Sequence, residues 1–543
     1  MKQGLKSPQT EIPSDPGAVQ ALVAKMREEH AALASDYREL QEKYARLLDQ
    51  VRLFQHQRFG PRSEKCHPDQ QDLFNEAEAV VEDVDAKTGE AADDTQAASG
   101  ETADAAPARK RGRKALPPTL PRVDVIHELP EAQRHCPEGH ALKVIGEEVS
   151  EQLDIIPAKI QVIRHIRKKY ACPCCEAHVK TAKAPQQPIP KSNASPGLLA
   201  WIVTAKFQDA LPLYRQSGML QRIGVDIARG TLATWVIRCG ELILPLINLM
   251  RDQLVLYDIQ QMDETTLQVL KEDGKKPQSK SYLWVQRGGP PDRHVLLFTC
   301  DSTRGQQVAE TLLGDYQGYL QADGYAGYDP VCAKNGLIQV GCFAHARRKF
   351  NEALKAQGKK NAQTKAGKAS KGLIYIQKLY RIEKQIKDLE PEARYRQRQQ
   401  HAVPLLAEIR TWLDKSLPQV PPASLTGKAL YYLDNQWHKL IRYCEDGRLE
   451  IDNNATERTI RPFVIGRNNW LFADTVDGAK ASGNLYSLIE TAKAHGLEPH
   501  RYLCHIFKEL PRTQSLEEVE QLLPWHVDKE QINSGWAKKV DGV

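Results

Sequence analysis

The chain lacks any apolar run long enough to cross a bilayer, and residues 1–17 lack the apolar core of a secretory signal. We therefore expect a cytosolic protein with no membrane partner. Cysteine is scarce, with 11 in 543 residues, and this odd, scattered set argues against a disulfide framework. Local cysteine clusters are better interpreted as metal sites or buried thiols. The length exceeds that of one hydrophobic core, so we expect several domains.

Negative charge is concentrated in one segment. Residues 72–104 hold eleven Asp or Glu and one Lys, so the rest of the chain carries a net charge of +16 against +6 for the whole. A basic body beside an acidic tract favours a polyanionic partner such as DNA.

Residues 19–54 have the apolar spacing of a coiled-coil helix, with alternating steps of four and three residues. The seam consists of Val19, Val23, Met26, His30, Leu33, Tyr37, Leu40, Tyr44, Leu47, Val51 and Phe54. The pattern predicts self-association, and hence a homo-oligomer. The alternative is an amphipathic helix packed on its own domain.

A polar segment and a basic arm follow this helix. Residues 66–108 are rich in Ala, Asp, Glu, Thr and Gly and are typical of a disordered linker. The linker ends in the sequence RKRGRKALPP, where Arg111 and Arg113 flank a glycine. Such an arm suits a narrow minor groove of DNA, although a solvated charge run is the alternative.

Two ligand pairs predict a zinc site. Cys136 and His140 form the first pair, and Cys172 and Cys175 form the second after a β-like stretch. Two such pairs on tight turns close a tetrahedral Zn²⁺ site in a small domain. Cys174, His135 and His178 are nearby substitutes, and ordinary reduced cysteines are the alternative.

Residues 191–250 are predicted to be helical and to contain a helix-turn-helix. The turn falls at 225–229 and the second helix begins with RGTLATWVIR, which places Arg229 in the first turn of a recognition helix. Lys206, Arg215 and Arg222 would contact phosphates. An ordinary helical hairpin is the alternative.

Residues 254–345 alternate strand-like and helical runs, which predicts an α/β core. Residues 351–445 interrupt it with long charged helices. Three carboxylates stand at element edges in this region: Asp263, Asp323 and Glu457. Two Asp and one Glu supply the oxygen ligands with which divalent ions promote phosphoryl transfer.

These carboxylates also have structural interpretations. The segment from Asn454 to Glu457 matches a capping box, and Asp323 with Gly324 matches a turn. Other carboxylates compete for the same roles. The competitors are Asp258 and Asp301 for the aspartates, and Glu450 and Glu490 for the glutamate.

Long motifs, in order, resemble transposases of the insertion sequence 66 family over nearly the whole chain. They are RFGPRSEK, RKRGRKALPPTLPR, KFQDALPLYRQ, GTLATWV, MDETTLQVL, ADGYAGY, GCFAHARRKF, DNNATERTIRPFVIGRNNWLF and LYSLIETAKAHGLEPHRYL.

The resemblance implies a multidomain α+β protein with a ribonuclease H-like α/β catalytic core. It assigns the Asp-Asp-Glu triad to Asp263, Asp323 and Glu457, with Mg²⁺ or Mn²⁺ as the catalytic ion. It also implies a helical insertion, a structural Zn²⁺ and accessory proteins of the same element. The family's first zinc pair has two cysteines, whereas here Gly139 and His140 take the second place, so the zinc geometry departs from the pattern.

The expected organisation has eight parts. They are a coiled-coil helix (1–65), a linker with a basic arm (66–119), a zinc region (120–190), a helical DNA-binding region (191–250), the first part of the core (251–350), the insertion (351–445), the second part of the core (446–490) and a C-terminal region (491–543). Further DNA contacts are expected from Arg347, Arg348, Arg458 and Arg461 near the triad.

The expected function is that of a bacterial, nucleoid-associated transposase that binds the inverted repeats of its element and cleaves and joins DNA. Two alternatives remain open: a catalytically inactive DNA-binding regulator and a metal-dependent nuclease. Residues alone do not reveal the repeat sequence, the target preference or the transposition route.

Overall fold

The computed structural model describes most of residues 20–47, residues 160–167, 169–171 and 179–181, and residues 185–357 and 367–534. Contacts divide the chain into two units, residues 1–82 with 187–532 and residues 83–186 with 533–543. In the second unit, β1 (Lys169–Ala171) pairs antiparallel with β2 (Val179–Thr181). The predicted linker and basic arm, including Arg111 and Arg113, lie outside the described residues.

The described residues between 20 and 47 are helical, as the seam pattern predicts. Seam residues Leu33, Leu40 and Leu47 are exposed by 71%, 64% and 61%. Apolar side chains in such a row remain in water unless another surface covers them. The seam positions at Val19, Val51 and Phe54 are outside the described part.

A mixed sheet forms the centre of the larger unit. Its strands are β3 (Ile259–Lys271), β4 (Lys280–Gly288), β5 (Val295–Asp301), β6 (Tyr319–Gln321), β7 (Ile338–Val340) and β8 (Ala473–Thr475). The order is β5-β4-β3-β6-β7, with β8 pairing the far end of β3. Strands β3, β4 and β5 are antiparallel, whereas β6 and β7 continue parallel to β3. The meander followed by β-α units agrees with the sequence pattern.

Both faces of the sheet are covered by helices, because its strands alternate large apolar side chains between two faces. On one face, Met262, Trp284 and Leu320 pack with helices α8 (Gln306–Leu313) and α9 (Asp329–Asn335). On the other, Leu283, Val285 and Phe298 belong to a larger core with α16 (Asn454–Trp470) and α17 (Val476–Ala494).

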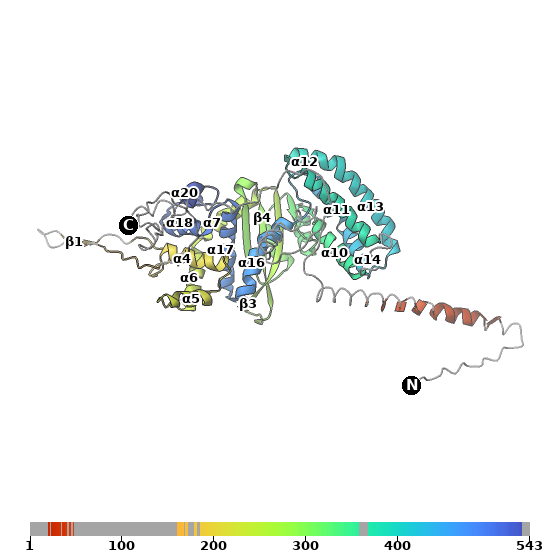
Figure 1. Cartoon of the computed structure of the whole chain (residues 1–543), viewed down its shortest axis with the longest axis horizontal. Coiled ribbons are helices and arrows are strands. Elements are labelled where there is room, and N and C mark those ends of the chain that lie inside the picture. Colours follow the sequence, from red (N-terminus) through yellow and green to blue (C-terminus); the bar gives the residue numbers. More distant parts are fainter. Residues whose placement is uncertain are drawn as a thin grey trace, which may run out of the picture. The chain divides into compact units, whose positions relative to one another are not determined.

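Helix α17 lies along the edge strand β5 (Figure 1). Its Ser487 and Thr491 hydroxyls bond the backbone N–H groups of Phe298 and Leu296 at 2.8 and 3.1 Å. The approach needs Gly483, because a Cβ there would lie 2.7 Å from the carbonyl oxygen of Phe298. The helix thereby covers an edge that would otherwise present unpaired donors.

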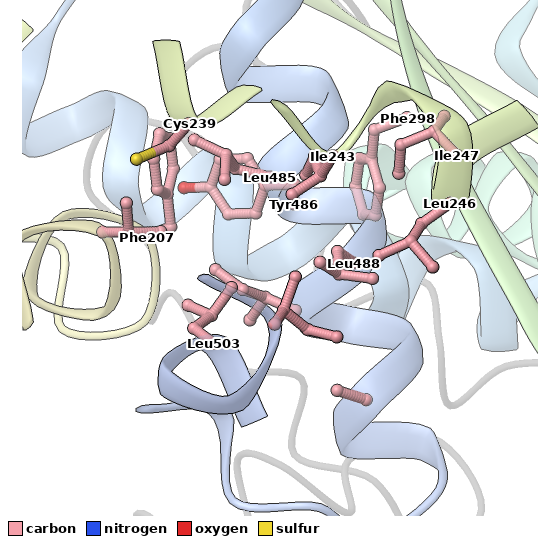
Figure 2. Close-up of a cluster of buried hydrophobic side chains, with 14 of the residues drawn as sticks. Phe207, Cys239, Ile243, Leu246, Ile247, Phe298, Leu485, Tyr486, Leu488 and Leu503 are labelled. Carbon is pink, nitrogen blue, oxygen red and sulfur yellow. The ribbon is translucent and has the colours of Figure 1, made fainter. Parts of the chain in front are cut away.

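Four helices precede the sheet: α4 (Pro196–Phe207), α5 (Leu213–Arg222), α6 (Arg229–Leu242) and α7 (Leu244–Val255). Figure 2 shows their contribution to the core, where Phe207, Cys239 and Ile247 surround Tyr486 and Leu488 of α17. The predicted turn between two helices is present, and α6 begins at Arg229.

Helix α10 (Phe343–Gln357) leads from β7 into a helical bundle. The bundle contains α11 (Lys368–Ile386), α12 (Pro391–Gln397), the π-helical turn η4 (Arg398–Ala402), α13 (Val403–Ser416), α14 (Leu425–Asn435) and α15 (Trp437–Leu440). It has its own core around Phe350, Leu379 and Leu413, and it stands beside the sheet in Figure 1. The segment between the second Asp and the Glu is therefore helical, as expected.

The chain closes with α18 (Pro499–Glu509), α19 (Leu516–Glu520) and α20 (Lys529–Asn533), of which α18 packs on α4. In the part that the structure describes, no single helix has the length and apolarity needed to cross a membrane, although α6 and α7 together, bent by 45°, pass that test.

Candidate active site

The parallel register of β3 and β6 determines where the two predicted aspartates lie. Gln261 is opposite Gln321 in the ladder, and their side chains share a 2.8 Å hydrogen bond. Asp263 and Asp323 each follow two positions later. Since strand side chains alternate between faces, Asp263 occupies the same face as Gln261. Asp323 follows just after β6 ends at Gln321, and its charge interacts with the Asp263 carboxyl.

A hydrogen bond joins the residue before α16 to strand β3. The Asn453 side chain donates to the Met262 carbonyl at 2.9 Å, and its backbone N–H donates to the Cys342 sulfur at 3.2 Å. Glu457 is in the first turn of this helix. Its carboxylate therefore approaches the two aspartates from the helical layer.

Helix α16 is also linked to the helical bundle. The Tyr380 hydroxyl of α11 donates to Asp452 at 2.7 Å, and the other Asp452 oxygen accepts from the Asn454 N–H at 3.1 Å. Burial raises the pKa of Asp452 to about 6. The bundle thus supports the turn that precedes Glu457.

The Asp263 carboxyl is strongly perturbed. Burial, followed by the nearby charge of Glu264, raises the pKa of Asp263 to about 8, and Asp323 and Glu457 add to the rise. A 2.8 Å bond from the Glu264 N–H opposes it. Asp323 and Glu457 are thus close enough for their charges to disfavour ionisation of Asp263.

Basic side chains approach these carboxyls. Arg304 lies 3.5 Å from Asp323, Arg348 lies 3.7 Å from Glu457, and His345 Nε2 lies 3.8 Å from Glu457. Arg304 is fixed by an ion pair with buried Glu264 and by stacking on Tyr325 at 4.0 Å. The contacts of Asp323 and Glu457 with these basic side chains are 3.5 Å or longer, so the two carboxylates can still accept other partners.

The donor chemistry suits a hard divalent cation, which prefers carboxylate oxygens and would relieve the repulsion that raises the pKa of Asp263. The side chains have not converged into a cage: among the described residues, no group of three or more His, Cys, Asp or Glu is close enough to hold a metal ion. Arg304 and Arg348 sit against two of the carboxylates, so a cation would replace them there.

Of the two structural interpretations of these carboxylates, the turn at Asp323 forms and the capping box with Glu457 does not. Helix α16 begins at Asn454 without a side-chain cap bond, and the Asn454 amide donates to Asp452 at 2.9 Å, so Asn454 and Glu457 do not form the capping box. Glu457 instead contacts His345 and Arg348. The turn does form, because Asp323 Oδ1 accepts from the Tyr325 N–H at 3.0 Å. Its second oxygen still faces Arg304.

The competing carboxylates have structural partners of their own. Asp258 pairs with Arg448 at 2.6 Å and Glu450 with Arg394 at 3.7 Å. Asp301 accepts from the Thr303 N–H at 3.0 Å in a turn after β5. Glu490 is buried in α17 and pairs with Lys493 at 2.9 Å.

The residues predicted to bind DNA fall into different settings. Arg348 is 55% exposed beside Glu457, whereas Arg347, the preceding residue, is buried. Arg458 and Arg461 are exposed on α16, and Arg215 and Arg229 are exposed on α5 and α6.

The Lys206 ammonium lies against aromatic rings, so it is less available to bind phosphate than its charge suggests. Its ammonium lies 5.2 Å from the Phe207 ring and 5.0 Å from the Trp470 ring, and burial lowers its pKa to about 8. Lys206 therefore packs against aromatic rings near the end of α16, and its contact with phosphate stays a prediction.

The sequence reasoning overlooked Glu264, Arg304 and His345. Glu264 and His345 belong to the quoted MDETTLQVL and GCFAHARRKF motifs, and His345 lies in the first turn of α10, which begins at Phe343 shortly after β7 ends at Val340. Arg304 has no local signal, because only the fold brings it to Asp323.

The predicted zinc ligands Cys136, His140, Cys172 and Cys175 lie outside the described residues. Cys172 and Cys175 fall in sequence between β1 and β2, whose strands pair from Lys169 to Thr181. No disulfide or metal geometry follows from this pairing.

Family models match four parts of the chain. A model described as the Transposase IS66 family matches residues 191–481, and the zinc-finger binding domain of transposase IS66 matches residues 133–176. The IS66 C-terminal element matches residues 487–525. A model described as Transposase C of IS166 homeodomain matches residues 46–125.

Two similar curated proteins come from Sinorhizobium fredii, and both are called uncharacterized. Protein y4jD is 33% identical over 77% of this chain and 82% of its own length. Protein y4qI is 30% identical over 97% of this chain and 99% of its own length. Because the Transposase IS66 family model matches more than half of the residues, the chain belongs to the IS66 family of transposases.

Proposed function

We propose that this transposase cleaves and joins DNA at the ends of its element, using Asp263, Asp323 and Glu457 to hold Mg²⁺ or Mn²⁺. The observation that carries the proposal is the β3–β6 register, which pairs Gln261 with Gln321 and so brings the two aspartates together. The docking of α16 on Met262 brings Glu457 to them.

The sheet supports a ribonuclease H-like core as the proposed fold. Three antiparallel strands are followed by two parallel ones, and the carboxylates belong to the first strand and to the end of the fourth. The helical insertion between Asp323 and Glu457 is compatible with this core because the Phe343 N–H at the start of α10 donates to the Ile451 carbonyl, three residues before α16, at 3.1 Å.

The chain's own residues have distinct proposed tasks. The bound ions would activate the attacking oxygen and stabilise the leaving one. Arg304 and Arg348, which now face Asp323 and Glu457, would turn to the phosphate oxygens of the DNA. Glu264 and Tyr325 would keep Arg304 in position. His345 would orient the Glu457 carboxylate.

The direct test is incubation of the purified protein with element-end DNA and magnesium, followed by sequencing of the products. Joined products at the element ends are expected. Cleaved but unjoined DNA would instead indicate a metal-dependent nuclease, and binding without either product would indicate a DNA-binding regulator.

We also propose one structural Zn²⁺ held by Cys136, His140, Cys172 and Cys175, in agreement with the zinc-finger family match. Purified protein should then contain about one zinc per chain. Elemental analysis of protein never exposed to a chelator checks this, and a stoichiometric absence of zinc would reject the site. Zinc loss should unfold residues 120–190 without removing the catalytic carboxylates.

The exposed seam of the N-terminal helix is proposed to join two copies of the chain, because transposition must coordinate two DNA ends. Replacing Leu33, Leu40 and Leu47 with Lys places three charges in the seam and should lower the mass of an oligomeric parent in light scattering. An unchanged mass would show that oligomers form elsewhere. Accessory proteins of the element remain expected partners.

A further inference from the structure

Helix α16 presents one exposed stripe that begins at the active site. Positions 457, 461, 465 and 468 follow the spacing of a single helix face, so Glu457, Arg461, Ile465 and Asn468 line up along it. Arg461, Ile465 and Asn468 are exposed, and Ile465 is exposed by 52%. Ile465 is thus an exposed apolar side chain between charged and polar positions of this stripe.

The charge of this segment is of one sign. Residues 458–473 contain Arg458, Arg461 and Arg467 and no Asp or Glu. The next acid, Asp474, is paired with Lys271 at 2.8 Å. Arg458 and Arg461 are exposed, whereas Arg467 bonds to Thr266 of β3. The exposed charge of α16 next to the carboxylates is therefore positive and complementary to a DNA backbone.

The stripe ends in an exposed apolar corner. Leu471 and Phe472 follow the last helical residue and are exposed by 61% and 42%. Leu471 has φ +68°, a left-handed conformation that costs free energy for any residue with a Cβ. An exposed leucine in such a conformation gains nothing for the fold, which favours a function for its side chain.

The elements before and after Leu471 and Phe472 are both anchored to strand β3. Trp470 packs edge-to-face on Phe463 at 5.3 Å, and Arg467 donates to Thr266 of β3. Immediately afterwards β8 pairs with β3, with Ala473 opposite Val269. Leu471 and Phe472 are therefore projected from a fixed turn between two anchored elements.

We infer that this face of α16 is a DNA-tracking surface and that Leu471 and Phe472 form an apolar wedge that unstacks a base step of the element end. The inference rests on the proposed function. The fourteen residue steps from Glu457 to Leu471 span about 21 Å along the helix axis, or about six base pairs of duplex. Apolar side chains inserted between base steps are a known way for proteins to distort DNA.

The test uses the full chain and an element-end duplex that carries the fluorescent adenine analogue 2-aminopurine, which brightens when it is unstacked. One duplex has the analogue about six base pairs from the cleaved phosphate, and another has it about twelve base pairs away. The wild-type protein should brighten the first several-fold and leave the second unchanged.

The informative variant is Leu471→Gly, because glycine adopts a φ of +68° without strain and the melting temperature should not fall. It should abolish the brightening and reduce joined products at least several-fold. The matched control is Leu256→Ala, since Leu256 is an exposed leucine at the end of α7 and should behave like the wild type.

The outcomes separate the two proposals. If the wild type cleaves the duplex but no position near the sixth pair brightens, the wedge is rejected and the proposed function stands. If Leu471→Gly lowers the mass of the DNA-free protein and leaves the brightening unchanged, the corner is a contact between copies and the wedge is again rejected. If the wild type neither binds nor cleaves element-end DNA, both proposals fail.

Discussion

Asp323→Asn is expected to abolish DNA cleavage and joining while leaving DNA binding nearly intact. Asn is close to isosteric, and its amide oxygen can still accept from the Tyr325 N–H, so the turn after β6 should survive. The substitution removes the negative charge that a divalent ion requires. We expect a loss of at least about 10³-fold, the scale seen when one member of a catalytic unit is removed.

Binding should persist because it depends on Lys and Arg neutralising phosphates, and these are untouched. Arg304 would lose one carboxylate partner but keep Glu264. Asp263→Asn and Glu457→Gln should have the same effect, and combining them should do no further harm, because the three act as one site. A gel assay with magnesium or manganese measures both cleavage and binding.

The controls are the competing carboxylates. Asp301→Asn should retain activity because Asp301 serves a turn after β5, and Glu490→Gln should retain it unless the loss of its pair with Lys493 destabilises α17. Cleavage at the wild-type rate by Asp323→Asn would remove that residue from the triad. An inactive Glu490→Gln beside an active Glu457→Gln would reassign the glutamate.

Arg398→Ala is expected to destabilise the helical bundle by about 3–5 kcal/mol, because the buried Glu383 carboxylate would keep only a looser pair with Arg394 at 3.8 Å. The Arg398 side chain is fully buried and donates twice to Glu383 of α11, at 2.6 and 3.0 Å. It also donates to the carbonyls of Tyr443, Asp446 and Leu449, each at 2.8 Å. One side chain thus joins the bundle to the segment that returns to the sheet.

Removing it leaves the Glu383 carboxylate and three carbonyl oxygens in a dry environment. Hydrogen exchange of the α11 and α13 amides measures the loss as a lower free energy of opening. Arg396→Ala is the matched control two residues earlier, because Arg396 and Glu392 form an exposed pair 3.8 Å apart whose loss should cost less than about 1 kcal/mol. Equal exchange in both variants would show that Arg398 does not hold the bundle.

Local patterns were sufficient wherever the structure depends on nearby residues. The turn before Arg229, the helical character of residues 368–444 and the meander from β3 to β5 follow from spacing, charge and turn residues. The motifs also sufficed for the family, since long segments in order are specific even where single carboxylates are not. The basic residues were harder, because charge alone does not say whether a side chain such as Arg347 or Lys206 is buried.

Pairing between distant segments was decided only by the tertiary structure. Nothing near Asp263 in the sequence says that Gln261 lies opposite Gln321, and a shift of one residue in that register would turn Gln321 to the other face and displace Asp323, which follows it. The separate roles of Asp258, Asp301 and Glu450 likewise depend on partners that the fold brings to them. The same holds for Arg304, which reaches Asp323 only across the sheet. By itself the sequence determined which residue types and local elements are available, because those depend on near neighbours. Strand register and burial, which depend on distant segments, determined which of the carboxylates lie close to one another.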